Sequence, residues 1–113
     1  MSEIKIVENS ISLRDLKDLA KEVFGDMVKA VVDLEKEIMA VGGEYHIDCE
    51  EVLIKQGSKL ENLYGGGYRV DTKEVEYMAM SNFKPTLGKT SYEIMDKDIR
   101  DKIYKLTMDY LEI

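Results

Sequence analysis

The sequence has one cysteine, one proline and one histidine in 113 residues. Because Cys49 stands alone, the chain can form neither an internal disulfide nor a multi-cysteine zinc or iron–sulfur site. Such cysteine usage suits a reducing compartment, and we expect a cytoplasmic protein. No stretch of about 18 apolar residues occurs, and Glu3 and Lys5 interrupt the start, so we expect neither a membrane span nor a signal peptide.

Positive charge is also scarce. The chain has 16 Lys and Arg against 23 Asp and Glu, which gives a net charge of −7. Nucleic-acid binders gain much of their affinity by neutralising phosphates, so this acidic protein is expected to bind neither nucleic acid nor an anionic membrane. One Gln and three Asn accompany many Lys, Glu and Ile, a bias that favours a thermophilic source.

What is present fits one globular domain. The composition is 44% hydrophobic and 35% charged, which differs from that of disordered chains. A chain of this length buries roughly two thirds of the surface that its unfolded form exposes. We find no repeat and no linker, so residues 1–113 are expected to form a single domain.

The first half of the chain changes its hydrophobic period. Residues 4–8 alternate and predict a strand, and residues 13–24 have helical spacing, with Ser12 as N-cap and Gly25 as the stop. After Met27 the period is two, which predicts antiparallel strands over 27–34 and 37–46, with Gly42 and Gly43 as a bulge or bend. The alternative is one helix over 28–40, but the Val-rich centre favours strands.

The second half predicts a helix, a hairpin and a final helix. Asp48 and Glu51 fit a capping box that would begin a helix over 49–56. Residues 61–70 and 74–84 flank a polar turn and predict a hairpin that Pro85 ends, and Asp96 caps a C-terminal helix. The order β-α-β-β-α-β-β-α indicates the α+β class. We expect an antiparallel or mixed sheet of about five strands, with three helices on one face.

Three stretches carry a family resemblance. They read GDMVKAVVDLEKEIMAVGGEYHID, QGSKLENLYG and SNFKPTLGKTSYEIMDKDIR. In order and spacing they resemble an uncharacterised prokaryotic family, the domain of unknown function 5674 family, over nearly the whole chain. Members read more like NIRPSQGN where this chain has residues 82–89, so Lys89 replaces an asparagine. The resemblance implies no established activity.

That lysine makes the segment KPTLGKTSYE resemble a phosphate-binding loop. The motif requires a second glycine where this chain has Phe83. The following helix begins with acidic residues, among them Asp96 and Asp98, which would repel a phosphate. We therefore reject nucleotide hydrolysis and interpret the segment as a connector between a strand and a helix.

Metal and catalytic chemistry are similarly disfavoured. Residues 46–51 contain several side chains of metal-ligand type, but no second histidine exists to complete a site. A Ser or Cys nucleophile with a histidine base would have to use His46, and Cys49 lies too close to it in sequence to indicate a triad. We expect no catalytic residue, no metal and no cofactor.

The segment YGGGY over residues 64–68 is the most unusual composition in the chain. Three glycines allow a sharp bend or the close approach of a ligand or a second backbone. In one hypothesis, which we favour, the protein is a non-enzymatic binding or assembly module that forms a homo-oligomer. In the other it is an enzyme or sensor for a small anionic ligand, with a pocket formed by segment 64–68, His46 and connector 84–91. Its expected ligand-binding residues are His46, Tyr64, Tyr68, Lys84, Lys89 and Arg100.

Overall fold

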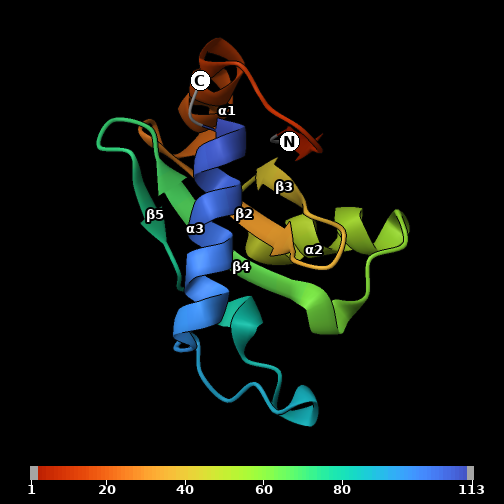
Figure 1. Ribbon diagram of the computed structural model, residues 1–113. Helices are drawn as coiled ribbons and strands as arrows, with labels where there is room; N and C mark the ends of the chain where they lie inside the picture. The colour runs from red at the N-terminus through yellow and green to blue at the C-terminus, as the bar shows by residue number, and fades with distance from the viewer. Residues whose placement is uncertain (1–2, 112–113) are drawn as a thin grey trace.

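Five strands and three α-helices follow one another in the expected order in the computed structural model, which describes residues 3–111 (Figure 1). The fold is therefore α+β, as predicted. The elements are β1 (Ile4–Val7), α1 (Leu13–Val23), β2 (Met27–Asp33), β3 (Ile38–Gly42), α2 (His46–Lys55), β4 (Leu63–Arg69), β5 (Glu74–Glu76) and α3 (Lys97–Leu111). Short 3₁₀ turns occupy Leu60–Asn62, Met80–Asn82 and Pro85–Leu87.

The strands form one antiparallel sheet in the order β1-β3-β2-β4-β5. The central strand β2 pairs with β3 on one side and β4 on the other, so that Val31 lies between Ala40 and Gly65. The β2–β3 hairpin confirms the period-two prediction, and the alternative of a single helix over 28–40 is wrong.

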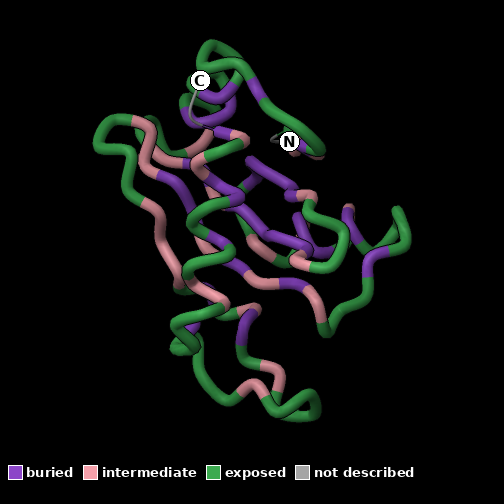
Figure 2. Tube along the Cα trace, in the orientation of Figure 1, coloured by how far each residue is buried: buried purple, intermediate pink, exposed green. Residues whose placement is uncertain are grey.

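Helices cover both faces of the sheet, which corrects the expectation of one covered face. Helices α1 and α3 pack on the face that carries Val28, Ala30 and Val32. Helix α2 packs on the other face, against Val31 and Ala40. Figure 1 shows α3 in front of the sheet and α2 behind it, and Figure 2 shows the buried chain concentrated in the strands between them. Val31 interrupts the alternation of β2 because both faces of this strand are buried.

Three local signals act as predicted. The Ser12 hydroxyl accepts a hydrogen bond from the Asp15 N–H at 3.1 Å and caps α1. Gly25, with φ +91°, follows the end of that helix. A carboxylate oxygen of Asp96 accepts from the N–H groups of Asp98 and Ile99 at 2.9 and 3.1 Å and caps α3.

The start of α2 differs from the prediction. The helix begins at His46, its N-cap is Tyr45, and no side chain caps it. Asp48 lies inside the first turn, so the proposed capping box with Glu51 is wrong. Strand β3 accordingly ends at Gly42, earlier than expected, and the two glycines that follow its apolar run have φ of +111° and +78° and form the turn into α2.

The strand predicted over 74–84 is also shorter than expected. Strand β5 ends at Glu76. The backbone then stops pairing with β4, and Met78 forms an isolated bridge with Glu93. Pro85 begins a 3₁₀ turn and does not end a strand.

The glycines of β4 allow another part of the chain to approach this strand closely. A Cβ on Gly66 would collide with the backbone carbonyl oxygen of Glu76, so a second backbone approaches this strand closely. A Cβ on Gly65 would lie 2.8 Å from Ala79 Cβ and 3.0 Å from Ser81 Oγ. The strand can therefore hold the end of β5 and the segment after it against itself only because these positions lack side chains.

Candidate functional site

The predicted ligand-binding residues lie at separate places around β4. Tyr68 is 2% exposed in the core beneath α3. Arg100 of α3 stacks over the Tyr77 ring at 4.3 Å from its centroid, and its guanidinium lies 3.6 Å from a Glu93 carboxylate oxygen. These two side chains have structural partners and line none of the hollows near His46.

Lys89 and Tyr64 do meet. The Lys89 ammonium lies 4.0 Å from the Tyr64 ring centroid and donates hydrogen bonds to the carbonyl oxygens of Glu61 and Leu63, at 2.9 and 3.3 Å. Burial, together with the nearby Lys84 ammonium, lowers the pKa of Lys89 to about 8. The lysine therefore closes the connector onto β4, and its ammonium is already engaged.

Lys84 forms a buried ion pair with Glu50 of α2. The Nζ and Oε2 atoms are 2.7 Å apart, and the side chains are 9% and 5% exposed. The same ammonium donates to the Ser81 carbonyl oxygen at 2.6 Å. This pair ties the connector to α2.

His46 spans the gap between α2 and β4. Its Nε2–H donates to the Gly66 carbonyl oxygen at 2.7 Å, which leaves Nδ1 unprotonated in the neutral ring. Burial is the main cause that lowers the pKa of His46 below its usual value of 6.5, and the Lys29 ammonium acts in the same direction. The imidazole is therefore neutral at physiological pH and serves as a donor to the strand.

Asn82 takes the place of a strand partner for β4. Its side-chain oxygen accepts from the Gly65 N–H at 2.7 Å, and its amide donates to the Gly65 and Tyr92 carbonyl oxygens at 2.9 and 3.0 Å. Asn82 is 4% exposed. Sequence reasoning did not identify this residue, because one asparagine carries no pattern that reveals such a distant partner.

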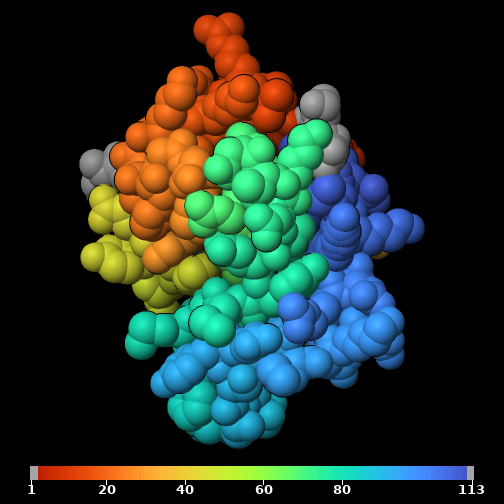
Figure 3. Space-filling model, turned by 90° about the vertical axis from the view of Figure 1, so that its left-hand side faces the viewer, coloured from red at the N-terminus to blue at the C-terminus, as the bar shows by residue number. Residues whose placement is uncertain are grey.

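A hollow of about 530 Å³ opens beside His46, and we call it the methionine hollow. Its walls come from β2, the start of α2 and the segment after β5, which lie side by side in Figure 3 in orange, yellow and teal. The lining residues are Lys29, Tyr45, His46, Ile47, Met78, Ala79, Met80 and Ser81. Of these, only His46 was predicted as a site residue.

The rim of the methionine hollow is apolar and exposed. Tyr45, Ile47, Met78 and Met80 are 60%, 55%, 59% and 79% exposed. The one cation of the lining, Lys29, lies 5.8 Å from the Tyr45 ring centroid and 5.2 Å from that of Phe24, which extends the aromatic surface. The alternation of Met78, Ala79 and Met80 was a usable signal, because two exposed methionines flank a buried alanine.

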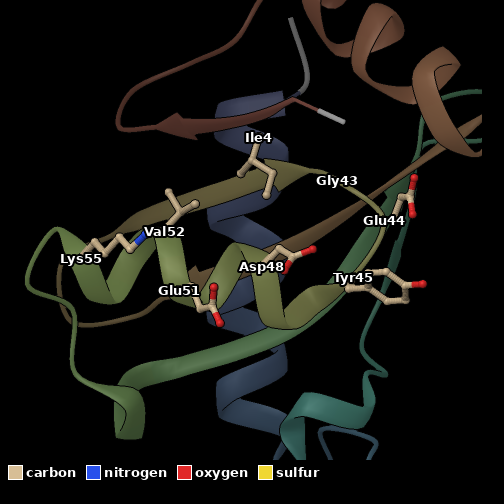
Figure 4. Close-up of a pocket in the computed structure, with 8 residues that line it drawn as sticks. All are labelled: Ile4, Gly43, Glu44, Tyr45, Asp48, Glu51, Val52 and Lys55. Carbon is tan, nitrogen blue, oxygen red and sulfur yellow. The ribbon is translucent and has the colours of Figure 1, made fainter. Parts of the chain in front are cut away.

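A second hollow, of about 350 Å³, lies between β1 and α2, and we call it the acidic groove (Figure 4). It is lined by Ile4, Gly43, Glu44, Tyr45, Asp48, Glu51, Val52 and Lys55. Despite these carboxylates, no three His, Cys, Asp or Glu side chains within residues 3–111 are placed to share a metal ion.

The connector has a geometry unlike that of a phosphate-binding loop. The N–H groups of Lys84 and Lys89 donate to each other's carbonyl oxygens at 2.8 and 3.1 Å, and the Gly88 N–H donates to Pro85. A phosphate-binding loop instead points its backbone N–H groups at the anion and leads directly into a helix. Here several donors are used within the turn, and α3 begins only at Lys97.

Comparison with known proteins identifies a family but no activity. The family described as "Protein of unknown function (DUF5674)" matches residues 5–110. The chain belongs to this family. The resemblance inferred from the sequence is thereby confirmed over nearly the whole chain. No curated protein and no solved structure matches significantly.

The helices of this DUF5674 member do not meet the needs of a membrane span. Within the part of the chain that the structure describes, none combines the length and apolar character required to cross a bilayer.

Proposed function

We propose that this protein is a non-enzymatic assembly module that forms a homo-oligomer through the methionine hollow. The observation that carries the proposal is the gathering of Tyr45, Ile47, Met78 and Met80, each more than half exposed, around one cavity. Contiguous exposed apolar surface of this kind marks interaction sites, and aromatic residues and methionine are enriched in interfaces.

The walls of the hollow are fixed before any partner arrives. Asn82 bonds to Gly65 and Tyr92, and Lys84 bonds to Glu50, immediately after the segment that carries Met80. These buried polar contacts hold the backbone next to Met80 in place. A preformed surface loses less conformational entropy on binding than a flexible one.

A second copy of the chain fits this surface best. A two-fold interface must be self-complementary, and here an exposed Met80 stands beside a hollow large enough for a methionine side chain. The lining contains Lys29 but no carboxylate, although the chain carries a net charge of −7. A two-fold contact through this face therefore brings no carboxylates of the two linings together.

The expected affinity is modest. Completing the burial of a half-exposed apolar side chain contributes roughly 1 kcal/mol, or about 8 kcal/mol for four side chains on each of two copies. Association costs about 4–15 kcal/mol in lost translational and rotational freedom and other terms. Because the two terms are of similar size, we expect a weak assembly whose extent depends on protein concentration.

The test is the molar mass in solution, measured by light scattering after gel filtration at a series of concentrations. Wild-type protein should exceed the monomer mass of 13.0 kDa as concentration rises. Met80→Glu should remain monomeric, because it places a carboxylate at the interface. The matched control is Met95→Glu, since Met95 is 68% exposed but lies outside the hollow. A monomeric wild type, or equal loss of assembly in both variants, would contradict the proposal.

The alternative function, binding of a small anion by the connector, has less support. Lys84 is paired with Glu50, Lys89 is bonded to two carbonyl oxygens, and Arg100 is beside Glu93. An anion would have to displace these partners. If millimolar inorganic phosphate raises the melting temperature by several degrees, that result favours anion binding over assembly as the function.

A further inference from the structure

The outer edge of β1 is open. This strand pairs only with β3, and no other strand of the described residues 3–111 lies along its far side. An edge strand presents unpaired backbone N–H and C=O groups, which another extended chain can use to add a strand to the sheet. The structure places the acidic groove directly beside this edge.

The groove has an apolar part and an acidic part. Figure 4 shows Ile4 reaching from β1 toward α2, while Asp48, Glu51, Val52 and Lys55 come from successive turns of α2. Glu44 and Tyr45 come from the segment before the helix. Ile4 and Val52 are each partly exposed and offer a contact for one apolar side chain.

The three carboxylates of the groove have no ionic partner within residues 3–111. No lysine or arginine side chain of this described part forms a salt bridge with Glu44, Asp48 or Glu51. Lys55 is the only cation in the lining. The groove is therefore negative and complementary to a basic partner.

We propose that the acidic groove and the β1 edge together bind an extended polypeptide segment that adds a strand to the sheet. Side chains of a strand alternate between its faces, so residues two positions apart point to the same side. The segment presents lysine or arginine to Glu44, Asp48 and Glu51, and an apolar residue two positions away to Ile4 and Val52.

Charge argues against a second copy of the chain as the occupant. A symmetric pairing of β1 with β1 would place both copies of α2 on the same side of the joined sheet and bring two negative grooves together. The inference is thus distinct from assembly through the methionine hollow, although Tyr45 lines both surfaces. It holds whether or not that assembly occurs, and Met80→Glu should still bind the segment.

The probe is the peptide acetyl-Lys-Thr-Val-Thr-Lys-amide, which carries lysine and valine on one face of a strand. Its control replaces both lysines with glutamate. NMR titration of the labelled protein should show saturable shifts with the lysine peptide and none with the glutamate peptide. Amide hydrogen exchange of residues 4–7 should slow in the complex, because strand addition protects the outward N–H groups.

Variants of the protein test the acidic part. The double variant Glu44→Lys with Glu51→Lys should bind the lysine peptide about tenfold or more weakly, since attraction becomes repulsion. The control is Asp18→Lys with Asp109→Lys, which changes the net charge equally at exposed positions outside the groove and should leave the affinity within about twofold.

Three results would overturn the inference. The first is equal binding of the lysine and glutamate peptides, and the second is binding without protection of residues 4–7. The third is protection of residues 4–7 without peptide that grows with protein concentration, which would mean that a second copy occupies the edge.

Discussion

Lys84 and Glu50 form an ion pair with an N–O distance of 2.7 Å although both side chains are nearly excluded from water. Lys84→Met would leave the Glu50 carboxylate buried without a counter-charge. Removing one member of such a pair typically costs about 3–5 kcal/mol, a large part of the stability of a small domain. Urea unfolding should therefore show a strongly lowered free energy of unfolding for this variant.

An exposed pair supplies the control for that measurement. Lys97 and Asp101 form an ion pair with side chains 87% and 64% exposed. Lys97→Met should change the free energy of unfolding by less than about 0.5 kcal/mol, because surface pairs contribute little. Combining Lys84→Met with Glu50→Leu should recover most of the loss. A similar effect of both single substitutions would contradict the role of burial.

Asn82 gives a second prediction, because its side chain supplies the hydrogen bonds that a strand would otherwise make to Gly65. Asn82→Ala leaves buried backbone groups without partners and should lower the free energy of unfolding by roughly 2–4 kcal/mol. Asn62→Ala is the control, since that side chain makes an exposed 3.2 Å bond to Glu35. Its expected effect is below about 0.5 kcal/mol, and equal losses would count against the prediction.

Asn82 also explains why the strand predicted over 74–84 is shorter in the structure. Segments 61–70 and 74–84 flank a polar turn and predicted a hairpin, and the chain does run beside β4 at first. Beyond Glu76 the side chain of Asn82, and no longer the backbone of a strand, bonds to Gly65. Strand propensity acts on neighbours in sequence, whereas this replacement depends on a partner 17 positions away.

The start of α2 has a similar cause. Asp48 and Glu51 have the spacing of a capping box, yet the helix begins at His46. The His46 ring is bonded to Gly66, which fixes the first turn from a distance. By contrast, Ser12 and Asp96 cap their helices through bonds within three residues, and such local signals were read correctly.

The site was harder to predict than the fold for a related reason. Residue type led to charged side chains such as Lys84 and Lys89, which the structure shows engaged with carboxylate or carbonyl oxygens. The methionine hollow instead joins three stretches of chain, around Lys29, Tyr45 and Met78. Only the packing of the sheet against α2 brings these stretches together.

Gly66 supports a third prediction, because a Cβ there would collide with the Glu76 carbonyl oxygen. Gly66→Ala must push β5 away from β4 and should cost at least about 2 kcal/mol. A Cβ added at Gly88 would meet nothing within 4 Å, although φ there is +76°. Gly88→Ala should therefore cost only about 1 kcal/mol, from backbone strain. Urea unfolding measures the loss of stability in each variant, from steric crowding at Gly66 and from backbone strain at Gly88. A larger loss for Gly88→Ala than for Gly66→Ala would contradict this account.

His46 makes stability depend on pH, and the direction follows from its surroundings. Burial lowers the pKa of His46 in the folded protein, whereas the unfolded chain takes up a proton near the usual value of 6.5. Between the two pKa values the unfolded state binds more protons than the folded state. The free energy of unfolding should therefore fall as the pH falls below about 6.5, and His46 should contribute no pH dependence well above it.

His46→Gln isolates this effect, because glutamine can still donate to the Gly66 carbonyl oxygen but does not titrate. The free energy of unfolding of each protein is measured by urea titration from about pH 5 to about pH 8. The free energy of unfolding of wild type minus that of the variant should be constant at the high-pH end of this range. At the low-pH end it should decrease, because only the wild type is destabilised by protonation of His46. Carboxylates titrate in both proteins and cancel in this difference. If the difference stayed constant, or if NMR placed the pKa of His46 at or above 6.5, burial would not control the protonation of this ring.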